Sequence, residues 1–162
     1  MERQDFSDDE WRTLQYGPYW AFMSVAAQDG NLDENEKNAF TDALADPGEM
    51  KGWLAKEVVN SVAAQPTAVF ARWQADDRSP ADGFAAITKI LAKADSDEAN
   101  RYKGTLIWLA VRVASASGSW LGGAISHKER AAIETVAEMV GFNVADAAMA
   151  TDVEGVMKAL PR

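Results

Sequence analysis

The sequence predicts an all-α fold, a single-domain bundle of about seven or eight helices that spans residues 1–162. Three observations lead to this prediction: apolar residues recur at helical spacing, no stretch sustains the alternation that a strand requires, and helix-start signals recur at short intervals. With 162 residues, of which 48% are hydrophobic, the chain is long and apolar enough to form one sizeable core.

Two helices are predicted before the first acidic turn. The capping-box spacing of Ser7 and Glu10 predicts the start of a short helix. The Gly17-Pro18 pair is expected to end that helix, because proline cannot donate the next hydrogen bond of the ladder. Pro18 suits the first turn of a second helix, which continues to about Gln28 and is apolar almost all round. This second helix is therefore expected at the centre of the core.

Each remaining helix is introduced by a capping residue or by a proline, both of which favour a helix start. The predicted starts are, in order, the Asp33/Glu36 box, the Asp46-Pro47-Gly48-Glu49 box, Pro66, Ser79-Pro80, Ser96 and Ser126.

The negative charge of the chain is concentrated at one end. Residues 1–50 carry 12 acidic and 3 basic side chains, so their net charge equals the −9 of the whole chain. This excess argues against nucleic acid and anionic membranes, and it favours cations and basic protein surfaces as partners. Direct membrane insertion is not expected either, because no apolar run is long enough. The chain has no cysteine, no apolar leader and no run of about 20 apolar residues. We therefore expect a cytoplasmic protein.

The acidic turn that begins at Asp29 has two interpretations. Asp33 and Glu36 have the spacing of a capping box, which alone accounts for both acids. The turn also resembles part of a calcium loop, although Val25 and Ala27 stand where the first two ligands would be, so it is not an EF-hand. Asp29, Asp33 and Glu36 are therefore candidate ligands of one divalent cation, with waters completing its coordination.

The same pattern recurs 93 residues later, so a helix-turn-helix unit is used twice, over about residues 18–45 and 106–142. The second copy carries five additional residues, 119–123. A repeated unit of this kind predicts a pseudo-twofold bundle with its two turns facing one another. The matched pairs are Leu32 with Ile125, Asp33 with Ser126, and Glu36 with Glu129.

The pattern A-x-D-G-x-[LI]-x-x-x-E follows an apolar helix, returns as G-x-[IL]-[ST]-x-x-E, and is followed by V-G-F. In these motifs the chain resembles the TerB-like tellurite resistance proteins and the related helical domain of DjlA-type membrane co-chaperones. The resemblance implies an all-helical pseudo-twofold fold, a cytoplasmic role in tellurite and other stress responses, and an acidic surface that holds a divalent cation, calcium or zinc.

Asp29, Asp33 and Glu36 match the acidic positions of the first motif, and Glu129 matches that of the second. The second motif has lost its other acids, since Ser126 stands at the capping position. We expect the first motif to dominate cation binding and Glu129 to assist.

The sequence predicts a non-enzymatic cation-binding module that needs no organic cofactor, because no nucleophile motif or phosphate-binding loop is present. His127, the only histidine, is a first-turn residue that could join Glu129 as a zinc ligand. A metal-dependent hydrolase is the lesser alternative. The main alternative is a metal-independent interaction module, which docks a membrane-associated stress complex through its acidic face and Trp120. The sequence leaves a homodimer open as well.

Overall fold

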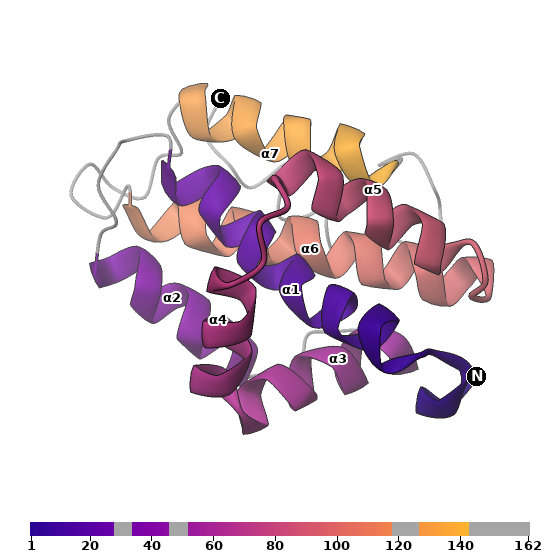
Figure 1. Ribbon diagram of the computed structural model, residues 1–162. Coiled ribbons are helices and arrows are strands. Elements are labelled where there is room, and N and C mark those ends of the chain that lie inside the picture. Colours follow the sequence, from indigo (N-terminus) through magenta and orange to yellow (C-terminus); the bar gives the residue numbers. More distant parts are fainter. Residues whose placement is uncertain (28–33, 46–51, 118–126, 143–162) are drawn as a thin grey trace.

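The computed structural model describes residues 1–27, 34–45, 52–117 and 127–142, and these ranges form seven α-helices and no strand (Figure 1). The predicted all-α class is therefore confirmed. A 3₁₀ helix, η1 (Arg3–Asp5), precedes the α-helices, which are α1 (Asp8–Ala26), α2 (Glu34–Ala45), α3 (Trp53–Ala64), α4 (Pro66–Gln74), α5 (Pro80–Leu91), α6 (Ser96–Ser117) and α7 (His127–Val140).

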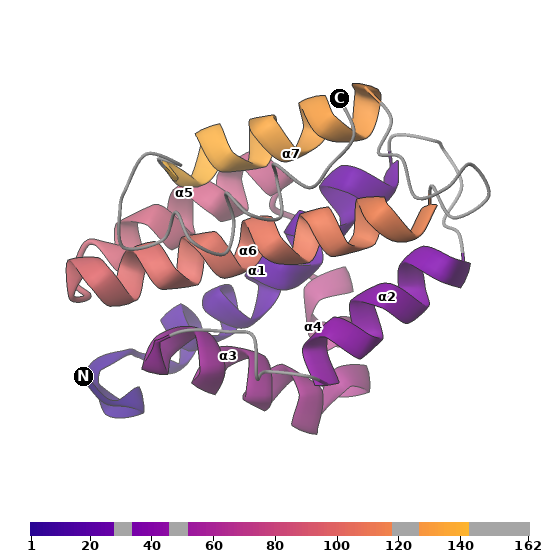
Figure 2. The same cartoon turned by 180° about the vertical axis from the view of Figure 1, so that it is seen from behind.

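Helices α1 and α6 form the centre of the bundle. They lie side by side, with α5 and α7 on one side of them and α2, α3 and α4 on the other (Figures 1 and 2). Helix α1 contacts α3, α4, α5, α6 and α7, and α6 contacts α1, α2, α3 and α7. Among the described helices, none has the length and apolarity that crossing a bilayer requires.

The second helices of the two units pack differently on the central pair. Helix α2, which follows α1 along the chain, packs against α6 and α3, whereas α7, which follows α6, packs against α6, α1 and α5. Helices α1 and α6 end where α2 and α7 begin, at one end of the bundle (Figures 1 and 2).

The predicted break at Gly17-Pro18 is wrong, because α1 runs through both residues without interruption. Pro18 has no amide hydrogen to donate to the carbonyl of Leu14, and the Tyr102 hydroxyl of α6 donates to that carbonyl instead, at 2.5 Å. Gly17 makes room for this contact, since a Cβ there would collide with the Tyr102 hydroxyl oxygen. Burial raises the pKa of Tyr102, which keeps the hydroxyl protonated and able to donate.

Helix α3 begins later than predicted. Gly52 precedes α3 with a φ of 88°. This backbone conformation favours glycine and does not occur within an α-helix, so α3 cannot extend to residues before Gly52. The amide of Leu54 in its first turn donates to the Glu98 carboxylate of α6, at 2.9 Å. The capping box predicted at residues 46–49 lies outside the described ranges.

Helix α6 is capped by Asp95 and not by Ser96. An Asp95 carboxylate oxygen accepts from the Asp97 amide at 3.0 Å, and Ser96 is already helical. The predicted start at Ser7 is confirmed, because its hydroxyl accepts from the Glu10 amide while the Glu10 carboxylate accepts from the Ser7 amide. The starts at Pro66 and Ser79-Pro80 are confirmed as well.

The turn between α4 and α5 is fastened to α1 by Arg78. Its guanidinium binds the Asp76 carboxylate at 2.8 Å, donates to the Thr13 hydroxyl at 3.3 Å, and lies over the Trp20 ring. The hydrogen bond from Arg78 lowers the pKa of Asp76. The pair is largely covered, with 18% of the Asp76 side chain and 30% of the Arg78 side chain exposed.

We expect Tyr102→Phe to lower the free energy of unfolding by about 1–3 kcal/mol, because the Leu14 carbonyl loses its side-chain donor in the core. Urea denaturation measures the change. The matched control is Tyr19→Phe, which removes a longer, partly buried bond to the Pro66 carbonyl at 3.3 Å and should cost less. Equal costs for the two variants would contradict this role of Tyr102.

Because the pKa of Asp76 lies below its unfolded value of about 3.9, its pairing stabilises the fold above that pH and is lost as pH falls through the folded-state pKa. Asp76→Asn should therefore lower the free energy of unfolding by about 1–2 kcal/mol at pH 7, and by progressively less below about pH 4. Denaturation curves across this pH range test it. Asp9→Asn, at an exposed ion pair, should show little effect at any pH.

Candidate functional site

The two motif glutamates both stand on the buried faces of their helices. Glu36 lies in the first turn of α2 and is 1% exposed, while Glu129 lies in the first turn of α7 and is 3% exposed. Glu36 shares its face with Phe40, four residues later, and Glu129 shares its face with Ile133 in the same way. The same helical spacing that places apolar side chains in the core therefore buries one carboxylate in each unit.

Burial makes these carboxylates chemically distinctive. An ionised carboxylate loses several kcal/mol of hydration when it leaves water, and a hydrogen-bond donor, a cation or a proton must offset that loss. Each glutamate also sits at a helix N-terminus, where the partial positive charge of the helix favours an anion. These positions suit a carboxylate that holds a cation or satisfies a helix start.

Both glutamates belong to the same end of the bundle. Glu36 and Glu129 lie in the first turns of α2 and α7, and Figures 1 and 2 show these two helix starts beside the ends of α1 and α6. Residues at equivalent positions of the 93-residue repeat therefore lie at the same end of the bundle.

Two of the four predicted ligands, Asp29 and Asp33, lie outside the described residues. Within the ranges that the structure describes, no group of three or more acidic, histidine or cysteine side chains is positioned to hold a metal. The structure therefore places half of the predicted ligand set, Glu36 and Glu129, and leaves the full set a prediction.

Other polar residues near these helix starts face the solvent. Glu34 is 79% exposed and pairs with Lys37 at 3.0 Å, so it does not join the buried glutamates. His127 is exposed at the first position of α7. Its predicted part in a zinc site remains a prediction.

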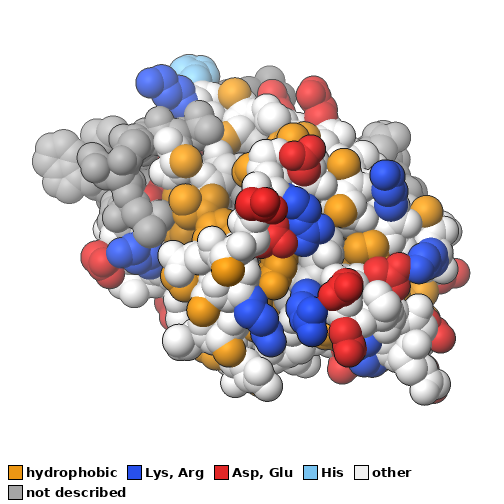
Figure 3. Space-filling view, in the orientation of Figure 1, with side chains coloured by type: hydrophobic (Ala, Val, Ile, Leu, Met, Phe, Trp, Pro, Cys, Tyr) orange, Lys and Arg blue, Asp and Glu red, His pale blue; other side chains and the backbone are white. Residues whose placement is uncertain are grey.

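The acidic face of the alternative prediction is partly neutralised. Figure 3 shows acidic and basic side chains interspersed on this side of the molecule. Trp120, the other part of that prediction, lies outside the described residues. Four carboxylates of the acidic arm carry ion pairs: Asp8 with Arg3, Asp9 with Arg12, Glu10 with Lys93, and Glu34 with Lys37.

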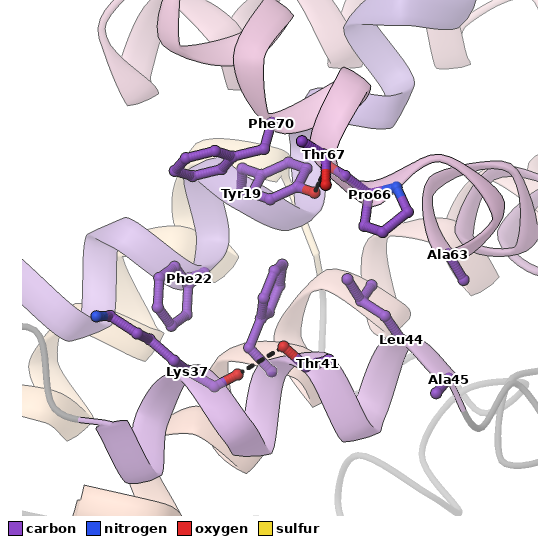
Figure 4. A pocket seen from close by; sticks show the side chains of 11 residues that line it. Tyr19, Phe22, Lys37, Thr41, Leu44, Ala45, Ala63, Pro66, Thr67 and Phe70 are labelled. Carbon is purple, nitrogen blue, oxygen red and sulfur yellow. Dashed lines mark hydrogen bonds between the residues drawn. The ribbon is translucent and has the colours of Figure 1, made fainter.

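An apolar groove of about 410 Å³, which the sequence does not predict, lies between α2 and α4 on the surface of α1 (Figure 4). Tyr19, Phe22 and Phe40 form its inner surface, and Phe70 of α4 forms part of its wall with 39% of its surface exposed. Aromatic residues at helical spacing predict core positions, and three of these four are indeed buried. Phe70 is the exception, since it belongs to a short helix in which only Val69 is buried, and its spacing in the sequence does not distinguish it from a core residue.

The chain is similar to an archaeal protein, the uncharacterized protein ORF11′ of Methanothermobacter thermautotrophicus. The two are 29% identical over 142 residues, which cover 83% of this chain and 88% of that protein. No protein-family model matches the chain, and no solved structure matches it. The similarity extends along most of both chains, and it brings no activity, ligand or partner with it.

Proposed function

We propose that the protein is a non-enzymatic module that binds a divalent cation, as part of a cytoplasmic response to tellurite and related stresses. The two sequence motifs support this proposal through their resemblance to the TerB-like proteins. The observation that carries it is the burial of both motif glutamates, Glu36 and Glu129, at equivalent positions of the two units.

Burial of this degree exceeds what helix capping needs. Glu10 completes a capping box while 22% of its side chain is exposed, and Asp82 follows the cap at Ser79 on an exposed position. These acids show that a helix start in this chain is satisfied at the surface. Glu36 and Glu129, by contrast, are carried into the interior, where a shared cation would offset the cost of burying two negative charges.

Carboxylate oxygens favour a hard cation, and calcium is the first candidate. The net charge of −9 in residues 1–50 raises the local concentration of cations around this end of the chain. The same charge repels an oxyanion such as tellurite. We therefore propose that the protein acts in tellurite resistance indirectly, through the cation and a protein partner.

Calcium at a hundredfold excess over its Kd should stabilise the metal-stripped protein by about 2.7 kcal/mol, or about 5–10 °C in Tm for a domain of this size. Glu36→Gln should abolish most of that gain, because glutamine keeps the size of the side chain but not its charge. Glu129→Gln should reduce the gain less. Melting curves with and without calcium, paired with calorimetric titration, measure both effects.

Two control variants match these substitutions. Glu34→Gln changes the same turn of α2 at an exposed position, and Glu134→Gln changes an exposed residue of α7. Both should keep the full calcium gain. If Glu36→Gln and Glu34→Gln respond alike, or if the unmodified chain shows neither heat nor a shift in Tm, the buried glutamates are helix caps and the proposed function is wrong.

A further inference from the structure

The groove between α2 and α4 is a built apolar site. Its floor is a set of aromatic rings in mutual contact, with ring centroids 5.3 Å apart for Tyr19 and Phe40 and 4.6 Å apart for Phe22 and Phe40. Leu44 of α2 and Phe70 of α4 face it from opposite walls (Figure 4). A volume of about 410 Å³ lies in the range of small-molecule sites, which are found between the helices of bundles.

Two of the polar groups in the groove are already engaged. The Tyr19 hydroxyl donates to the Pro66 carbonyl at 3.3 Å, and the Thr41 hydroxyl donates to the Lys37 carbonyl at 2.9 Å. An occupant therefore gains chiefly by burying apolar surface, which requires no hydrogen-bond partner. A flexible aliphatic chain meets this condition.

Among the described residues that line the groove, Lys37 is the one that carries a charge. Its stem runs past Phe22, and its ammonium lies at the edge of the groove (Figure 4). The ammonium pairs with Glu34 at 3.0 Å, but 43% and 79% of the two side chains are exposed, so this pair is weak. An ammonium has three donors, so that of Lys37 can donate to a second carboxylate beside the first.

We propose that this groove binds an aliphatic chain with an anionic head, such as a medium-chain carboxylate. The chain lies over the aromatic floor between α2 and α4, and the carboxylate binds the ammonium of Lys37. The net charge of the protein opposes an anion at long range, so burial of the chain supplies most of the affinity. This site is separate from the buried glutamates.

The test is calorimetric titration of the full chain with octanoate, decanoate and dodecanoate below their micellar concentrations. One site per chain is expected, with binding about three- to fourfold tighter for each added methylene until the groove is full. Lys37→Gln should weaken dodecanoate binding several-fold. Lys89→Gln, at an exposed lysine of α5, is the matched control and should leave it unchanged.

Filling the groove should remove the site. Ala63 lines it from an exposed position near the end of α3, and Ala63→Phe should weaken dodecanoate binding at least tenfold. Phe70→Ala, at the exposed wall, provides a second variant whose helical content is checked by circular dichroism. The proposal is overturned if dodecanoate does not bind, if neither variant weakens its binding, or if dodecyltrimethylammonium binds as tightly as dodecanoate.

Discussion

The bundle depends on the close contact between α1 and α6, which centres on the hydrogen bond from Tyr102 to the Leu14 carbonyl. Pro18 leaves that carbonyl without its usual donor, and Gly17 leaves the space through which the hydroxyl reaches it. This contact joins the two helix-turn-helix units, because α1 opens one and α6 opens the other. The way α1 packs against α6 sets where α2 and α7 start, and it therefore sets the positions of Glu36 and Glu129.

Helix starts that depend on neighbouring residues could be predicted from the sequence, as at Ser7 and Ser79, where side chain and amide are three residues apart. Features decided by distant residues could not. The continuity of α1 at Pro18 depends on a tyrosine 84 positions later, and the start of α3 is satisfied by a carboxylate of α6. Capping residues and prolines indicate which conformation a segment favours by itself. The continuity of α1 and the start of α3 depend instead on side chains of α6 that pack against them.

The candidate sites follow the same division. The repeat identified Glu36 and Glu129 as equivalent, and amphipathic periodicity places both on buried faces. The groove was not predictable, because Tyr19, Phe40 and Phe70 have the spacing of ordinary core residues. Whether such rings pack fully or leave a cavity depends on the separation of α2 and α4, which the sequence pattern does not contain.

The packing of α1 against α6 places two buried carboxylates at one end of the bundle, and we propose that they share a cation there. Diffraction from crystals grown with manganese, recorded at the absorption edge of the metal, tests this most directly, since manganese accepts the same oxygen ligands as calcium. We predict an anomalous peak within bonding distance of carboxylate oxygens of both Glu36 and Glu129. A peak confined to exposed acids such as Asp8, or no peak, would contradict it.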